Sequence, residues 1–72
     1  MNLKQVISQH AVDGWVPAGD YAVQKGRMCI SVASVNDQPH FLLADGDTIV
    51  LGSSDAEKCK DAARRGPVDL FG

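Results

Sequence analysis

The sequence lacks the closely spaced ligands and the many cysteines that build metal sites and disulfide frameworks. Its 72 residues include two cysteines and two histidines, namely Cys29, Cys59, His10 and His40. Structural zinc sites present their ligands in close pairs, whereas these four residues are far apart in sequence. The pattern therefore excludes the common zinc motifs. We expect no bound metal, two reduced cysteines that pack as small apolar residues, and histidines at the ends of elements.

Recognisable catalytic motifs are absent as well. The chain has no nucleophile elbow, phosphate-binding loop or convincing pair of carboxylates. Asp45-Gly46-Asp47 begins like a calcium loop, but the later ligands are missing and a hairpin turn explains it better. A cysteine–histidine pair assembled by the fold stays open as an alternative, although Cys29 falls in a predicted strand and Cys59 in a predicted helix, where thiols are normally inert. We therefore expect a protein that is not an enzyme and binds no cofactor.

Neither a strong net charge nor a long apolar run is present. Seven basic residues against nine acidic ones give a formal net charge of -2, which is the wrong balance for a general nucleic-acid binder. No run approaches the ~20 apolar residues of a membrane-spanning helix, and the first ten residues, MNLKQVISQH, have no secretory core. These absences predict a cytoplasmic protein that makes no membrane contact.

The short length limits what the chain can build. A domain of this size buries only about 60% of the surface of its unfolded chain, so nearly all of its apolar content is needed for the core. The hydrophobic fraction of 44% is ordinary for a globular protein. We expect one domain over residues 1–72, with little room for an enclosed active site.

The N-terminal segment has the period of a helix. Asn2 is a candidate N-cap and Gly14 a candidate stop, while Pro17 cannot continue a helix. The apolar residues between them fall on one helical face at Leu3, Val6, Ile7 and Ala11. The pattern predicts a helix over residues 3 to 12, followed by a connection over residues 15–19.

After Gly19 the apolar residues alternate, which is the period of a strand. Two strands, around residues 21–23 and 28–32, are separated by a turn at Lys25-Gly26. Residues 36–39 (NDQP) are a strong turn signal, and two further strands follow at 41–43 (FLL) and 48–51 (TIVL). If Asp45-Gly46 is a two-residue type I′ loop between them, Phe41 opposes Val50 and Leu42 opposes Ile49.

A capping box marks the start of a C-terminal helix. Ser54 is the predicted N-cap, with Glu57 reaching back to it, and Arg64 and Arg65 complement the helix dipole at the other end. Gly66 and Pro67 stop the helix, and the apolar tail at 68–71 either docks on the core or belongs to an interface. The predicted packing face of this helix consists of small residues: Ala56, Cys59, Ala62 and Ala63.

These elements predict an α+β fold made of an N-terminal helix, a four-stranded antiparallel β-meander in sequential order and a C-terminal helix. The second hairpin is apolar on both faces, although a half-solvated strand should alternate apolar with polar residues. Either the two helices cover opposite faces of the sheet, or one face is left to bind a partner or a second copy. We assign that binding face to Phe41, Leu43 and Val50.

The other candidate binding residues are aromatic or basic, because such residues dominate binding energy at interfaces. They are Trp15, Tyr21, Arg27, Arg64 and Arg65. Trp15 has a second interpretation as an anchor of the core.

The most consistent functional interpretation is a small non-enzymatic protein-binding regulator. Its size and lack of chemistry are typical of phage- or mobile-element-encoded proteins that bind and inhibit or re-tune a larger host complex, such as RNA polymerase or a CRISPR effector. One alternative is nucleic-acid binding through Lys25, Arg27 and the helix over residues 58–65, although this basic cluster also fits a solvated helix face. Another is a self-associating structural subunit, with a homodimer as its simplest form.

Overall fold

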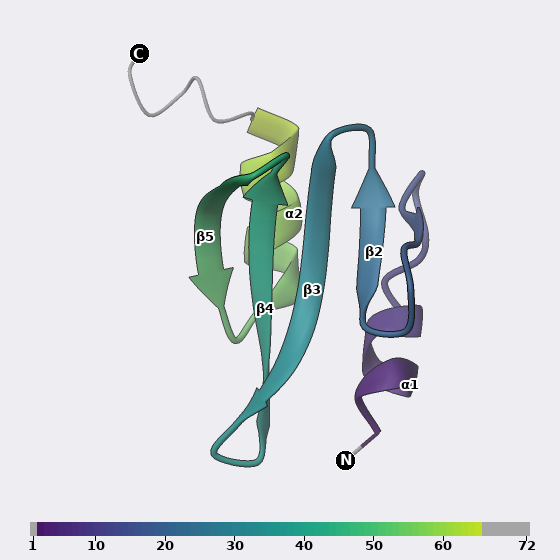
Figure 1. Cartoon of the computed structure of the whole chain (residues 1–72), viewed down its shortest axis with the longest axis vertical. Coiled ribbons are helices and arrows are strands. Elements are labelled where there is room, and N and C mark those ends of the chain that lie inside the picture. The colour runs from purple at the N-terminus through teal and green to yellow at the C-terminus, as the bar shows by residue number, and fades with distance from the viewer. Residues whose placement is uncertain (1, 66–72) are drawn as a thin grey trace.

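Two helices pack against a five-stranded antiparallel sheet (Figure 1). The computed structural model describes residues 2–65, so Gly66, Pro67 and the apolar tail lie outside the described residues. Strand order follows the sequence, which confirms the predicted α+β meander. In chain order the elements are α1 (Leu3–Ser8), β1 (Val16–Pro17), β2 (Ala22–Lys25), β3 (Met28–Val35), β4 (Gln38–Asp45), β5 (Thr48–Ser53) and α2 (Ala56–Arg65).

The strand count differs from the prediction because part of the expected connection joins the sheet. Val16 pairs with Gln24, and Pro17 with Val23, which makes β1 a two-residue edge strand. Proline is tolerated there because the outer side of an edge strand needs no ladder hydrogen bond. The sheet therefore has five strands rather than four.

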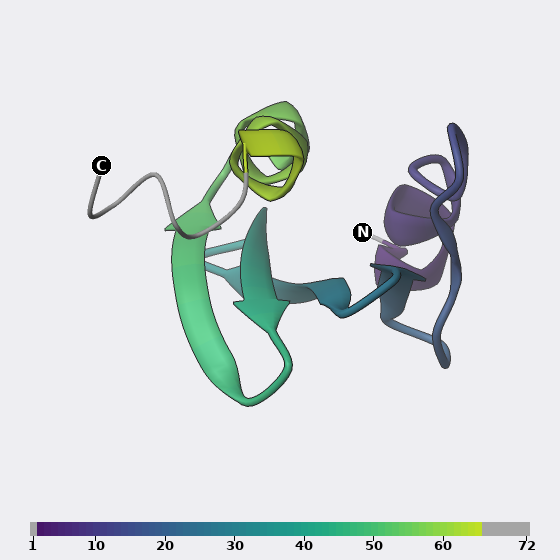
Figure 2. The ribbon, with the colours of Figure 1, turned by 90° about the horizontal axis from the view of Figure 1, so that it is seen from above.

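Both helices cover the same face of the sheet, as the view along the strands shows (Figure 2). α1 packs on β2 and β3, whereas α2 lies over β4 and β5. A single core forms between this face and the helices, and it takes one residue of α1 and two of α2. Its buried members are Ile7, Trp15, Val23, Ile30, Val32, Phe41, Leu43, Ala56 and Cys59.

Helix α1 is shorter than the predicted helix over residues 3 to 12. Its start is as expected, because the Asn2 side chain accepts a hydrogen bond from the Gln5 N–H at 3.2 Å. The helix ends at Ser8, and the chain then turns through Asp13 and Gly14, which have φ angles of 57° and 93°. This left-handed pair, which glycine accommodates readily, redirects the chain into Trp15 and the core.

Asp55, not Ser54, caps helix α2. The Asp55 Oδ1 atom accepts from the Glu57 N–H at 3.0 Å, while the Ser53 Oγ atom accepts from the Asp55 N–H at 3.0 Å. The predicted Ser54 capping box is therefore wrong by one residue, since both residue types can supply the capping oxygen. The predicted packing face is confirmed, with Ala56 and Cys59 buried.

We expect Asp55→Ala to lower the free energy of unfolding by about 1 kcal/mol, because it removes the N-cap acceptor. Ser54→Ala is the matched control and should change stability by less than about 0.5 kcal/mol. Urea denaturation followed by circular dichroism measures both. A larger loss of stability in the Ser54 variant than in the Asp55 variant would show that Ser54 caps the helix, as the sequence predicted.

The β4–β5 hairpin has a different register from the predicted one. Its two-residue loop is Gly46-Asp47, and Gly46 has a φ of 60°, as the first central position of a type II′ turn requires. Asp45 therefore opposes Thr48, and the predicted pairs of Phe41 with Val50 and Leu42 with Ile49 are wrong. A bulge between Leu43 and Ala44 shifts the register again.

The bulge explains why three apolar residues in a row fit β5. An inserted residue lets neighbouring side chains depart from strict alternation. Val50 and Leu51 both pack against the core, while Ile49 lies on the opposite face.

Candidate protein-binding surface

The sheet face opposite the helices, which we call the open face, is covered by no element among residues 2–65. The pairing registers arrange its side chains in rows that cross the strands, and two of these rows extend over four or five strands. Small or apolar residues predominate in both rows. One row consists of Val16, Gln24, Cys29, Ala44 and Ile49, and the other of Ala22, Ser31, Leu42 and Gly52.

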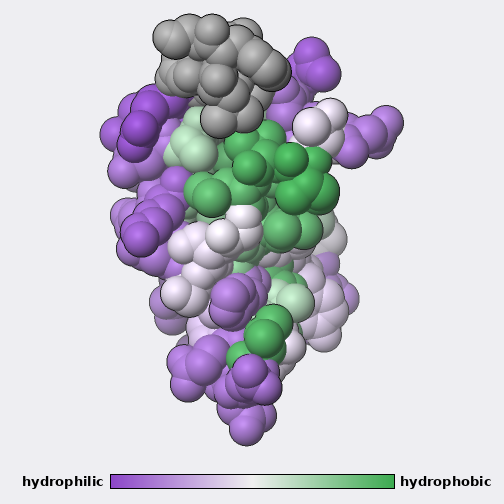
Figure 3. All heavy atoms as spheres, turned by 90° about the vertical axis from the view of Figure 1, so that its left-hand side faces the viewer, coloured by the Kyte–Doolittle hydropathy of each residue, from purple (hydrophilic) through white to green (hydrophobic). Residues whose placement is uncertain are grey.

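Leu42 of β4 and Ile49 of the edge strand β5 are two large apolar side chains of this surface. They are 41% and 58% exposed. Phe41 and Leu43, which flank Leu42 in the sequence, are only 4% and 0% exposed. The space-filling view shows a hydrophobic cluster over β5, bordered by hydrophilic residues (Figure 3). The two faces of the hairpin therefore differ sharply in exposure.

The structure largely buries the hairpin face that the sequence assigned to binding. Phe41 and Leu43 are core residues because they lie opposite Val32 and Ile30 of β3, which point under the helices. Val50 is half-buried and packs on the same core. These three residues cannot form the exposed surface, and sequence reasoning missed Leu42 and Ile49 as its members.

The remaining predicted residues are not brought together. Trp15 is 6% exposed and belongs to the core, which confirms its interpretation as an anchor and leaves little of its side chain for a partner to contact. Tyr21 is exposed just before β2, while Arg64 and Arg65 lie on α2, across the sheet from the open face.

Arg27 lies at the tip of the β2–β3 hairpin. Its carbonyl oxygen accepts a hydrogen bond from the Gly46 N–H at 3.0 Å, which ties the two hairpin tips together. Its Nε atom lies 3.3 Å from the Asp45 Oδ1 atom. The exposed guanidinium thus lies next to the loop that carries Asp47.

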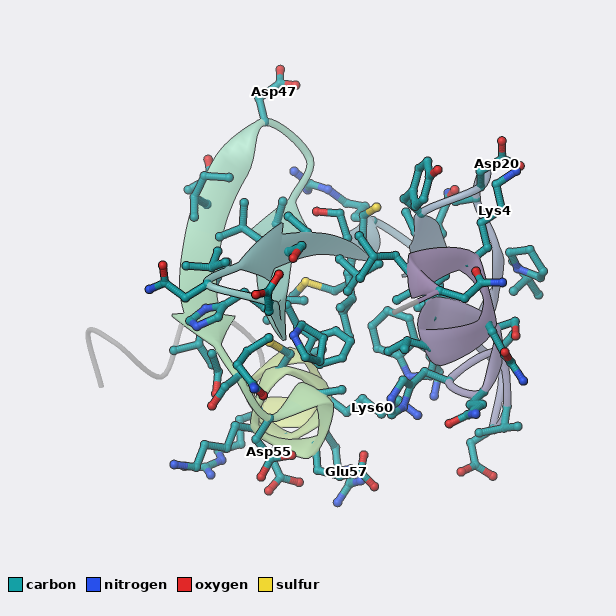
Figure 4. The ribbon with its side chains drawn as sticks, turned by 90° about the horizontal axis from the view of Figure 1, so that it is seen from below. Lys4, Asp20, Asp47, Asp55, Glu57 and Lys60 are labelled. Carbon is teal, nitrogen blue, oxygen red and sulfur yellow. The ribbon has the colours of Figure 1, made fainter. Side chains whose placement is uncertain are left out.

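A cleft of about 430 Å³ separates α2 from the segment that follows α1 (Figure 4). The Lys25 Nζ atom donates to the Asp13 carbonyl oxygen at 3.0 Å, and the Lys60 Nζ atom lies 4.0 Å from the Glu57 Oε2 atom. Among the described residues no buried side-chain N or O atom lacks a partner. The cleft is lined by Asp13, Trp15, Lys25, Met28, Glu57, Lys60, Ala63 and Arg64.

Cys59 has the surroundings of a structural thiol. Its Sγ atom donates to the Phe41 carbonyl oxygen at 3.8 Å, and burial, reinforced by the charge of Asp55, raises its pKa. A raised pKa keeps the sulfur protonated and therefore poorly nucleophilic. Cys29 lies on the other side of the sheet, and residues 2–65 contain no cluster of three metal-ligating side chains.

His10 packs edge-on against the Phe41 ring, with the centroids 5.4 Å apart and the planes at 79°. Burial, aided by the nearby Lys60 charge, lowers the pKa of His10 below 6.5, while Glu57 and Asp55 oppose this shift. Because the unfolded chain then binds a proton more readily than the folded one, stability falls as the pH drops through 6.5 towards the lower folded pKa.

We expect His10→Gln to reduce this loss of stability between neutral pH and pH ~5. The measurement is the urea midpoint at each pH, with His40→Gln, an exposed site, as the control. An unchanged pH profile in the His10 variant would show that other groups cause the loss.

Comparison with known proteins identifies no relative, because no family model, curated protein or solved structure matches the chain. Helices α1 and α2, the helices of residues 2–65, are both too short and too polar to cross a membrane.

Proposed function

We propose that the chain is a non-enzymatic protein-binding regulator whose binding surface is the open face. One observation carries the proposal: both helices lie on the same side of the sheet, so Leu42 and Ile49 stay exposed on the other. Burying such a side chain completely is worth about 1.5–3 kcal/mol, and a partner that covers the face would gain part of this energy.

The proposal includes a cytoplasmic location and a larger host complex as the partner. The two free cysteines support a reducing compartment, where disulfides rarely persist. The capture experiment below identifies the complex, which could be RNA polymerase, a CRISPR effector or another large assembly.

Nucleic-acid binding through α2 has weaker support from the charge arrangement. Lys60 is largely buried beside Glu57, and the Arg64 guanidinium lies 3.5 Å from an Asp61 carboxylate oxygen. Lys58 and Arg65 are the cations of this helix without an ion-pair partner in the described part of the chain. Two such charges would neutralise few phosphates, so any binding of nucleic acid by this helix should be weak.

The test is affinity capture with the immobilised protein and with a Leu42→Lys/Ile49→Lys variant. We expect the variant to lose a protein that the wild type retains, with recovery reduced at least about tenfold, because two lysines would have to be desolvated in the interface. Val12→Lys is the matched control, since Val12 is 49% exposed but lies in the α1–β1 connection.

Two outcomes would contradict the proposal. One is equal recovery of every captured protein by the wild type and the double variant, provided that circular dichroism shows both to be folded. The other is recovery of nucleic acid alone, lost on raising the salt concentration.

A further inference from the structure

We infer that, when no partner is bound, a second copy of this chain covers the open face, so that the free protein is a two-fold symmetric dimer packed sheet against sheet. The inference rests on the proposed function, because it takes the open face to be a protein-binding surface. It adds that a second copy of the chain is one occupant of the open face. Any regulated partner must therefore compete with this second copy for the same surface.

The open face is divided into a half with large side chains and a half with small ones. Leu42 and Ile49 rise from β4 and β5, whereas β2 and β3 present the small residues Ala22, Cys29 and Ser31 together with one longer side chain, Gln24. The register places Ser31 directly beside Leu42 in one row, and Cys29 beside Ala44 in the other. In the row of Leu42 and Ser31, this surface is complementary in shape to a second copy in which the two halves are exchanged.

A two-fold axis that runs parallel to the strands, between β3 and β4, makes this exchange. It lays β4 over β3 of the second copy and β5 over β2 of the second copy, and it keeps the two rows in register. Leu42 then packs over Ser31 of the second copy, and Ile49 packs in the row of Gln24 of the second copy. Sheets stacked with nearly aligned strands pack about 10 Å apart, a separation that the pair of Leu42 and Ser31 can fill.

The same axis brings opposite charges together. The hairpin tips that hold Arg27 and Asp47 lie at one end of the sheet, as the hydrogen bond from the Gly46 N–H to the Arg27 carbonyl oxygen shows. Asp47 projects away from α2, towards the side of the open face (Figure 4). Arg27 lies 3.3 Å from Asp45 of its own chain, and exchange of the two halves also brings its exposed guanidinium towards Asp47 of the second copy, an approach that two-fold symmetry makes twice.

Pairing through the sheet edges is less favourable than pairing through the face. β1 is two residues long and contains Pro17, and β5 carries the bulge next to Val50. Short edge strands, prolines and bulges are the devices that prevent edge-to-edge pairing. The face is therefore the surface on which two copies can meet.

The size of the face predicts a weak dimer. The four strands that overlap, β2 to β5, lie about 4.8 Å apart and are about six residues long, which gives a footprint of about 400 Å², or about half of what one partner buries in a standard interface. We therefore expect dissociation in the micromolar to millimolar range, so that the dimer forms on concentration.

Sedimentation velocity on the full chain at about 5 μM and about 500 μM tests the inference, together with the labelling rate of Cys29 by an aromatic disulfide reagent. Cys29 is half-buried on the open face and the dimer covers it, whereas Cys59 is fully buried in the core at any concentration. We expect the sedimentation coefficient to rise with concentration and Cys29 labelling to slow at least about threefold.

Leu42→Lys and Ser31→Arg alter opposite halves of the face, and each should keep the chain monomeric at the higher concentration, while Val12→Lys should dimerise like the wild type. A wild type that stays monomeric, with constant Cys29 labelling, overturns the inference and leaves the capture test of the proposed function standing. A dimer that survives both face variants, or that leaves Cys29 equally reactive, also overturns it. If one variant fails to fold, the wild-type Cys29 rates decide.

Discussion

Replacing Leu43 by alanine should lower the free energy of unfolding by about 2–5 kcal/mol. The side chain is completely buried between Ile30 and Leu51, so its loss leaves a cavity that the sheet cannot easily close. A chain of this length has a total stability of only about 4–11 kcal/mol. The variant should therefore lose a large part of the total stability, which urea and thermal denaturation would show as clearly lower midpoints.

Leu42→Ala is the control for this prediction, because the two leucines are adjacent in sequence and lie on opposite faces. Leu42 is 41% exposed, and its truncation should cost less than about 1 kcal/mol in the monomer. Similar losses in the two variants would mean that both faces are covered, and they would contradict the open face itself.

Trp15→Ala should have an effect of similar size, about 3–5 kcal/mol. Trp15 joins the left-handed turn after α1 to the core, and it also forms one wall of the cleft next to α2. Its removal should loosen the attachment of α1 and β1 to the sheet. Thermal denaturation followed by circular dichroism measures the loss.

Trp15→Phe provides the matched comparison, since it keeps an aromatic ring at the site and should cost clearly less than the alanine variant. A Trp15→Ala protein with unchanged stability but reduced capture of a partner would support the role in binding that the sequence suggested.

Much of the fold could be predicted from the sequence because local patterns and tertiary packing agree. Met28, Ile30 and Val32 alternate with small residues, and the structure uses them as a strand with one buried side. The end of α1 could not be predicted in this way. Ala11 continues the helical pattern, but the turn at Asp13 and Gly14, which brings Trp15 to the core, ends the helix earlier.

The β4–β5 register was ambiguous because the sequence Asp-Gly-Asp permits two hairpin loops. Asp45-Gly46 suits a type I′ turn, whereas Gly46-Asp47 suits type II′, which needs glycine only at its first central position. The structure has the second loop, together with a bulge that no local pattern marks. Each change of one residue moves side chains to the other face of the sheet.

The candidate surface was misplaced for the same reason, although a usable signal was present. Asn36 and Asp37 form a two-residue loop with φ angles of 51° and 63°, as a type I′ turn requires. That loop places Phe41 opposite Val32 and Leu43 opposite Ile30, inside the core. Counting from this turn rather than from Asp45-Gly46 would have identified Leu42 as exposed.

The sequential order of the strands also bears on how the chain finds its fold. Every strand pairs only with its neighbour along the chain, and each of the three hairpins from β2 to β5 closes through a loop of two residues. Closing a short loop costs little chain entropy, and low contact order correlates with rapid folding. The sheet can thus grow outward from the Asn36-Asp37 turn by successive local steps, with β1 and β5 added last.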